Sequence, residues 1–350
     1  MKSSTLRARL RSISIGIGAL ALVASFATTP ATASTTNKGL FGSPNEYASV
    51  QLQSQALLGL VSARVAPSPN AVNWLLDQQC DNGAFQGYRA DTAVPCADSD
   101  PVNFSGPSAD QTAWALMALA AVGEEAPAKK AAKWLISIAQ AQPNGTLGIP
   151  SYAGGTPDAN SSGLSLSALN GMGTSRSTAM KIQRFLGSLV TPCGDTRGGA
   201  ARYQSAVPGA NNSATAQAYF GITTSIPVYS PPAKSGIPKC GKNATNKLGS
   251  YLAQQITQDS LLTYYPYDGN DYGDTALTIV AFSGKAIAKQ AISKGTAALK
   301  ANAREWALKD GVPNAGALGS LLLVSVATDS NPKNFGGINL IAEITKSETK

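Results

Sequence analysis

Two kinds of apolar segment alternate along the chain. One kind carries apolar residues at positions i, i+3, i+4, i+7 and i+8, as in the stretch 131–139 and again in 182–190. This spacing predicts an amphipathic helix with one face buried and the other in water. An aromatic–Leu pair marks each copy, and successive pairs are 60, 51 and 66 residues apart: Trp74-Leu75, Trp134-Leu135, Phe185-Leu186 and Tyr251-Leu252.

The second kind of segment is small and apolar on all sides, so a helix formed by it must be buried. Gly- and Asp/Asn-rich loops separate the two kinds, and an Asp or Asn stands where each buried helix should begin, as expected of an N-cap. The buried segments are 51–62, 111–122, 161–172, 213–222, 275–282 and 315–327. The expected N-caps are Asp110, Asn160, Asn212, Asp274 and Asn314.

Six buried helices and about six amphipathic ones predict an all-α fold. The amphipathic count includes the less regular stretches 286–300 and 334–346. We expect two concentric layers closed into a ring, an α6/α6 toroid, because an open solenoid would need polar capping repeats and the sequence shows none. The final helix, near Ile338 and Ile341, is expected to pack outside the first buried helix and close the ring.

The first 33 residues have the parts of a secretory signal peptide. Lys2 and three arginines precede an apolar stretch at 13–27, and Ala31-Thr32-Ala33 provides small residues for cleavage. An uncleaved anchor is the alternative, but this stretch is short for a membrane span and rich in Gly and Ser. We expect cleavage after Ala33, no stable membrane insertion, and one domain over residues 34–350 that is secreted or held at the cell surface.

The charge balance gives no reason to expect a nucleic-acid partner. The chain has 28 basic and 20 acidic residues, and loss of the four basic residues in 1–33 leaves 24 against 20, or +4. No basic block accompanies this small excess, so it bears on solubility and not on nucleic-acid binding. We expect a monomer.

The chain contains no histidine, which excludes His-based triads and His-bound zinc. Its four cysteines are expected to form two disulfides, because an exported chain is oxidised and a metal site would need spacings that are absent here. The pairs are Cys80–Cys96 and Cys193–Cys240. The second pair requires residues 223–243 to fold back along the rim, since alternating helices place its two cysteines on opposite faces.

One repeat unit resembles the prenyltransferase/squalene-oxidase type of repeat. It runs from Trp74-Leu75-Leu76 through Asp81-Asn82-Gly83-Ala84-Phe85 to Gln111-Thr112-Ala113-Trp114. The likeness covers most of residues 45–345 and is best over 71–172. It implies the α/α toroid shared by terpene cyclases, protein prenyltransferases, complement thioester domains and cobalamin carriers.

The catalytic signatures of those families do not match this chain. The stretch Asp98-Ser99-Asp100-Pro101 lacks the last Asp of the cyclase Asp-x-Asp-Asp acid. Cys193-Gly194-Asp195-Thr196 lacks the Gln of a thioester, and prenyltransferase zinc needs a histidine. The resemblance therefore implies the fold and leaves the activity open.

The most suggestive cluster for ligand binding is the stretch 264–274, which is rich in Tyr and Asp. Tyrosines at the start of a buried helix offer flat apolar surface with a polar tip, suited to a sugar, a planar molecule or a lipid headgroup. The same residues also fit an ordinary turn with Asp caps, and that alternative stays open. The candidate binding residues are Tyr264, Tyr265, Tyr267, Asp268 and Tyr272, with Trp114 from another repeat.

We expect no cofactor and no metal site. Asp81, Asp91, Asp98 and Asp100 could hold calcium through oxygen ligands, but their spacing fits no known calcium loop, which favours a solvated surface loop.

Three functions fit the sequence. The preferred one is a non-catalytic binding protein that captures a small molecule or partner at the mouth formed by the buried helices. An enzyme of the terpene cyclase or carbohydrate-active kind is the alternative, with Asp110, Asp271 and Asp274 as its acids. A cell-surface scaffold or adhesin that works through its outer face is the third.

Overall fold

Helices that are apolar on nearly every side form the inner layer of the fold, as their sequence requires. The computed structural model describes residues 37–225, 236 and 238–350, so the expected signal peptide lies outside the described residues. The inner helices are α1 (Ser49–Ser62), α3 (Ala109–Val122), α5 (Ala159–Gly171), α7 (Asn212–Thr223), α9 (Tyr272–Lys285) and α12 (Ala315–Ala327).

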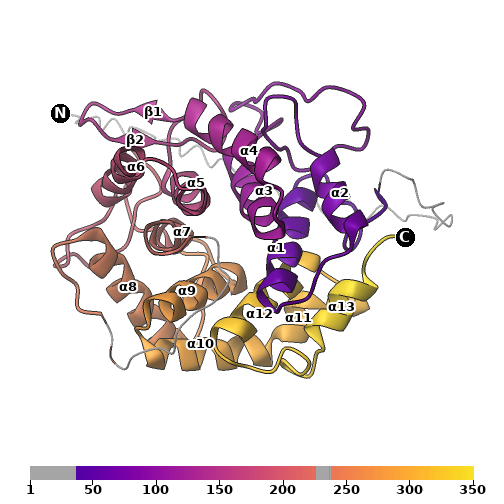
Figure 1. Ribbon diagram of the computed structural model, residues 1–350. Coiled ribbons are helices and arrows are strands. Elements are labelled where there is room, and N and C mark those ends of the chain that lie inside the picture. The colour runs from indigo at the N-terminus through magenta and orange to yellow at the C-terminus, as the bar shows by residue number, and fades with distance from the viewer. Residues whose placement is uncertain (1–36, 226–235, 237) are drawn as a thin grey trace, which may run out of the picture. The chain divides into compact units, whose positions relative to one another are not determined.

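These inner helices form a closed ring. Each packs against the next in the order α1, α3, α5, α7, α9 and α12, and α12 packs in turn against α1. Figure 1 shows the indigo start of the described chain beside its yellow end, as this closure requires. The predicted all-α toroid is therefore confirmed.

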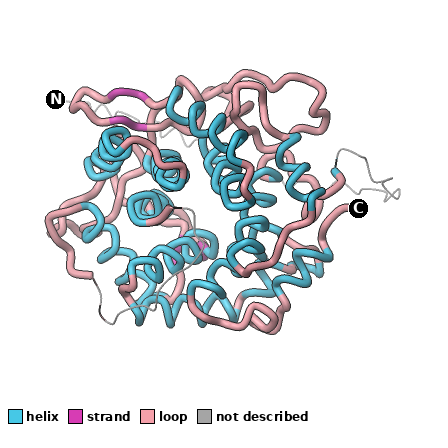
Figure 2. Tube along the Cα trace, in the orientation of Figure 1, coloured by secondary structure: helices cyan, strands magenta, loops and turns pink. Residues whose placement is uncertain are grey.

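Amphipathic helices cover the ring from outside. Figure 2 shows that helices and loops make up nearly all of the described chain, with few strands. Trp74 and Trp134 lie buried between the two layers, as their position in the apolar stripe predicts. The outer helices are α2 (Pro69–Asp77), α4 (Glu125–Ser137), α6 (Arg176–Ser188), α8 (Ala244–Asp259), α10 (Lys289–Ala301), α11 (Ala303–Ala307) and α13 (Leu340–Lys346). A 3₁₀ turn, Lys309–Gly311, follows α11.

The end of the chain closes the ring differently from the prediction. Helix α13 packs against α12, not outside α1, and the seam itself is the direct contact of α1 with α12. The last residues instead pair with the first described ones: Gly39 donates its backbone N–H to Thr349 (2.7 Å), and Thr349 donates its own to Leu40 (2.8 Å).

Glycines permit the closest approaches in the inner ring. A Cβ on Gly319 of α12 would lie 2.3 Å from the backbone oxygen of Gln55 on α1. A Cβ on Gly163 of α5 would likewise lie 2.3 Å from the backbone oxygen of Gln217 on α7. Only a residue without a side chain lets these helices touch backbone to backbone.

The predicted N-caps of the inner helices were wrong in four of five cases. The caps are Ser108, Asp158, Asn211 and Asp271, and only Asn314 was placed correctly. Each of these side chains accepts a hydrogen bond from the backbone N–H three residues ahead, so the helix begins one to three residues earlier than expected. As a result, Asp110, Asn160 and Asp274 lie inside the first turn, where the helix can direct them inward.

Two short antiparallel hairpins connect the layers. Strands β1 (Gln140–Ala141) and β2 (Leu147–Gly148) lie between α4 and α5. Strands β3 (Leu262–Thr263) and β4 (Asn270–Asp271) lie between α8 and α9, and β4 delivers Asp271 to the start of α9.

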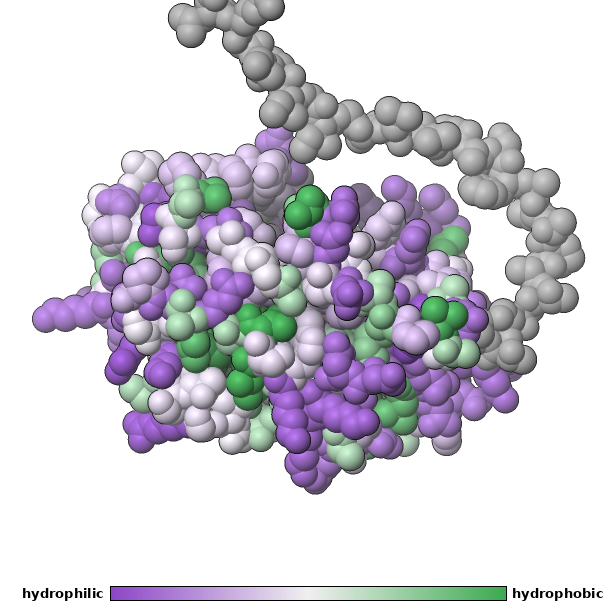
Figure 3. All heavy atoms as spheres, turned by 90° about the horizontal axis from the view of Figure 1, so that it is seen from above, coloured by the Kyte–Doolittle hydropathy of each residue, from purple (hydrophilic) through white to green (hydrophobic). Residues whose placement is uncertain are grey.

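Both predicted disulfides are present, Cys80–Cys96 and Cys193–Cys240. Much of the segment expected to fold back between the second pair lies outside the described residues, so that prediction stays open. Two disulfides fit an oxidising compartment. None of the helices in the described ranges is long and apolar enough to cross a membrane. On the face shown in Figure 3, hydrophobic residues form small patches among hydrophilic ones.

Candidate functional site

A cavity of about 340 Å³ lies at the centre of the inner ring, and each of its six helices contributes lining residues. On each helix, residues three or four positions apart lie on the same inward face, so they line the cavity at successive depths. The first turns supply a polar rim: Gln51, Asp110, Asn160, Ser213, Asp271 and Asp274. The middle positions are mixed, with Trp114, Leu164 and Leu277 beside Gln55, Gln217 and Ser320, and the positions one turn further along are apolar: Phe220, Val280 and Leu323.

A pair of carboxyl groups at the start of α9 forms one side of the rim. Asp271 caps the helix by accepting the backbone N–H of Asp274 on Oδ1 (2.9 Å), and its Oδ2 accepts the Ser213 hydroxyl from α7 (3.1 Å). Asp274 accepts the side-chain amide of Gln217 on Oδ1 (3.2 Å). All these donors are uncharged, so they form hydrogen bonds with the two carboxyl groups but do not balance a negative charge on them.

A second carboxyl pair stands between α3 and α5. Asp158 caps α5 by accepting the backbone N–H of Ser161 on Oδ1 (2.8 Å), and it is only 1% exposed. Asp110, in the first turn of α3, lines the cavity and is close enough that its charge affects Asp158. Sequence analysis missed Asp158. Aligning the repeats at their N-caps would have identified it as the equivalent of Ser108 and Asp271.

Burial makes ionisation of these groups unfavourable. It raises the pKa of Asp110 to about 6, and burial together with the Asp110 charge raises the pKa of Asp158 to about 7. Burial also raises the pKa of Asp271, and burial with the neighbouring Asp271 charge raises that of Asp274 well above the ordinary range. Nearby Tyr152 and Tyr203 also have raised pKa values, first through burial and then through the charge of the aspartates.

The two sides of the rim face one another. Helices α3 and α9 are three places apart in the ring of six inner helices, so Asp110 lies across the cavity from Asp271 and Asp274. The three candidate acids therefore line one cavity. Proton donors on opposite walls could act on two sides of a molecule held between them.

Only part of the proposed binding cluster lines the cavity. Trp114 contributes to its wall, and Tyr264, about half exposed, stands at its opening. Tyr265 instead lies under the Arg197 guanidinium, 3.5 Å from its ring centroid, and Tyr272 packs against Trp306.

The turn of the β3–β4 hairpin carries the other two members, Tyr267 and Asp268. Tyr267 is 74% exposed and Asp268 is also exposed, and neither contributes to the cavity wall.

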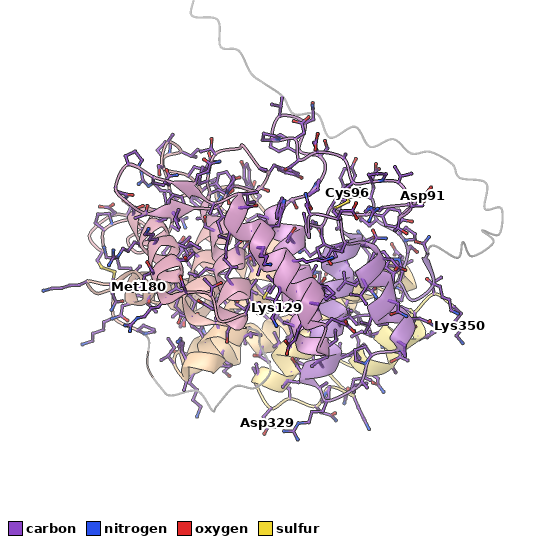
Figure 4. All side chains as sticks on the ribbon, turned by 45° about the horizontal axis from the view of Figure 1, so that its top comes forward. Asp91, Cys96, Lys129, Met180, Asp329 and Lys350 are labelled. Carbon is purple, nitrogen blue, oxygen red and sulfur yellow. A yellow bond between two sulfur atoms is a disulfide. The ribbon has the colours of Figure 1, made fainter. Side chains whose placement is uncertain are left out.

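The acidic loop between α2 and α3 has the features of a surface loop. Asp91 and Asp100 accept backbone N–H groups two residues ahead, as turn-forming aspartates do. Figure 4 shows Asp91 and Cys96 in this same loop. Among the described residues, no group of three or more His, Cys, Asp or Glu side chains is placed to hold a metal ion.

No family model matches the sequence, and no curated protein is significantly similar to it. Solved structures with a related arrangement include a protein from Actinoplanes (14% identity, 80% of this chain and 90% of that one, TM-score 0.49). An endo-1,4-D-glucanase from Vibrio fischeri is 13% identical over 79% of this chain and 86% of its own, with a TM-score of 0.48. The type II terpene cyclase MstE from Scytonema is 14% identical over 78% and 67%, with a TM-score of 0.41. Likenesses this weak assign no activity, and the fold rests on the helix contacts described above.

Proposed function

We propose that this is an exported protein that binds a small molecule in the central cavity. The observation that carries the proposal is the lining of that cavity, which is polar at the helix N-termini, mixed at the middle positions and apolar beyond them. A volume of about 340 Å³ is within the range of small-molecule sites. The ligand would place an apolar body against Trp114, Phe220 and Leu277, and a hydrogen-bonding end at the rim.

Native mass spectrometry of the protein secreted by its own host tests this proposal. We expect a non-covalent mass that is lost on denaturation. Leu277→Trp should reduce retention of that molecule at least tenfold, because the larger ring fills the cavity, whereas Leu277→Ala should retain it. A bare wild-type protein, or a Leu277→Trp variant with its ligand intact, would contradict binding in the cavity and favour a surface scaffold or adhesin.

General-acid catalysis in the same cavity is the second candidate function. The observation that favours it is the buried pair Asp271 and Asp274 on the cavity wall, where burial raises both pKa values and so favours the protonated, proton-donating form of each carboxyl group. Asp110 faces this pair from the opposite wall.

The same mass measurement separates the two functions. Incubation of the released molecule with fresh protein leaves it unchanged if the protein only binds, and changes its mass or retention time if the protein catalyses. Asp274→Asn should then abolish the change, while Asp268→Asn, on the exposed turn of the same hairpin, should not affect it.

A further inference from the structure

Unpartnered oxygen atoms gather where α3 and α5 begin. Asp110 Oδ1, Asp158 Oδ2, Asn160 Oδ1 and Ser161 Oγ are each buried and have no hydrogen-bond partner. The Ser161 hydroxyl lies close enough to both carboxyls to oppose the rise in their pKa values, yet it makes no hydrogen bond of ordinary geometry. Buried carboxyl oxygens are costly to leave unmatched, so this concentration needs a cause.

The start of α9 provides a matched comparison, because the two sites have the same plan. Each combines the N-cap and third residue of one inner helix with the second residue of the inner helix before it. In one site these are Asp158, Ser161 and Asp110.

In the α9 site they are Asp271, Asp274 and Ser213, so an acid and a serine have exchanged places. There, protein donors bind Asp271 and Asp274, and neither residue has a buried unpartnered oxygen. The fold therefore does not require such oxygens at this position.

No basic side chain in the part of the chain that the structure describes supplies what the α3–α5 site lacks, since no cation is among the groups that shift the pKa of Asp110 or Asp158. The single salt bridge among the described residues joins Lys129 to Glu125, an exposed pair on the outer helix α4. A small cation bound by the four oxygens would balance the negative charge of both carboxylates and give each oxygen a partner.

We propose that Asp110, Asp158, Asn160 and Ser161 form a calcium site in the wall of the central cavity. Calcium accepts carboxylate, amide and other neutral oxygens in irregular arrangements, whereas magnesium requires a strict octahedron and keeps several of its waters. Asp110 and Asn160 also line the cavity, so solvent there can complete the coordination. With only two carboxylates, the affinity belongs to the weak range of extracellular calcium sites, a Kd of about 10⁻⁴–10⁻³ M.

Calcium itself is the probe for the test. Protein treated with EDTA and then dialysed is titrated with CaCl₂ at pH 7.5, followed by calorimetry and by the thermal unfolding midpoint. We expect saturable binding with a stoichiometry of one and a rising midpoint. Asp158→Asn and Asp110→Asn should each weaken binding at least tenfold.

Asp271→Asn is the matched control, because it alters the N-cap carboxyl of the related site at α9 and should leave the calcium response intact. The proposal is overturned if wild-type protein shows no saturable binding up to about 10 mM calcium, or if Asp158→Asn binds as tightly as wild type. Because this readout needs no organic ligand, it succeeds or fails independently of the proposed small-molecule binding.

Discussion

At the scale of single residues, Asp274 is a buried carboxyl group without a positively charged partner among the described residues. It is 8% exposed, Gln217 donates its side-chain amide to it, and the neighbouring Asp271 and Ser213 also affect its pKa. Burial and the Asp271 charge raise its pKa well above its ordinary value near 3.8. The folded protein therefore holds this proton more tightly than the unfolded chain does, and its contribution to stability is present at low pH and lost as pH rises through the folded pKa.

Asp274→Asn should remove that pH dependence. We expect the variant to exceed wild type in free energy of unfolding by about 1–3 kcal/mol at pH 8, because burial penalises the ionised carboxyl of the folded wild type and the neutral amide avoids that penalty. The difference should shrink toward pH 4. Urea denaturation in EDTA across this range measures it, with the exposed Asp268→Asn as control. Parallel curves for the variant and wild type would contradict the prediction.

The candidate site was predictable from sequence only in part. Asp110, Asp271 and Asp274 stood out as acids at helix starts, and all three line the cavity. Their exact helix positions did not follow from residue type, because several neighbouring Ser, Asn and Asp residues are equally good caps and tertiary contacts decide among them. Tyr265 and Tyr272 illustrate the remaining difficulty: their partners, Arg197 and Trp306, are distant in sequence.

At the scale of helices, the glycines of the inner ring control how closely neighbouring helices pack. The helix pattern itself was readable, because buried and amphipathic helices differ so clearly in composition. The seam between α1 and α12 was not, since the close approach at Gly319 depends on which two helices meet.

Gly319→Ala should destabilise the ring at that seam. The new methyl group would lie 2.3 Å from the backbone oxygen of Gln55, so the helices must separate, at a cost of about 1–3 kcal/mol. Gly187→Ala is the control: the nearest neighbour of its Cβ would be Ala244 Cβ at 3.6 Å, an ordinary contact, and alanine favours the α6 helix by up to about 1 kcal/mol. Equal effects of the two substitutions on the unfolding midpoint would contradict this account.

At the scale of the whole molecule, the two disulfides constrain loops of different length. Cys80 and Cys96 are 16 residues apart, whereas Cys193 and Cys240 are 47 apart. In the chain-entropy description, a cross-link across a longer loop removes more freedom from the unfolded chain. The number of disulfides was predictable from the cysteine count, whereas the observed pairing is one of the three that four cysteines allow.

Replacing both cysteines of a pair by serine should therefore cost different amounts of stability. We expect a loss of about 4 kcal/mol for Cys193→Ser with Cys240→Ser, and about 3 kcal/mol for Cys80→Ser with Cys96→Ser. Denaturant unfolding of the two double variants measures the difference. A clearly larger loss for the shorter loop would show that native-state contacts, not chain entropy, dominate.

The backbone pairing of Gly39 and Leu40 with Thr349 has a further consequence for how this fold can be engineered. Because the two ends of the folded region lie side by side, a short peptide could join them without disturbing the ring. New ends could then be opened in the exposed β1–β2 turn at Asn144-Gly145, giving a circular permutant with the same cavity. The same proximity would allow the whole toroid to be inserted into a surface loop of another protein, which would carry the cavity as a module.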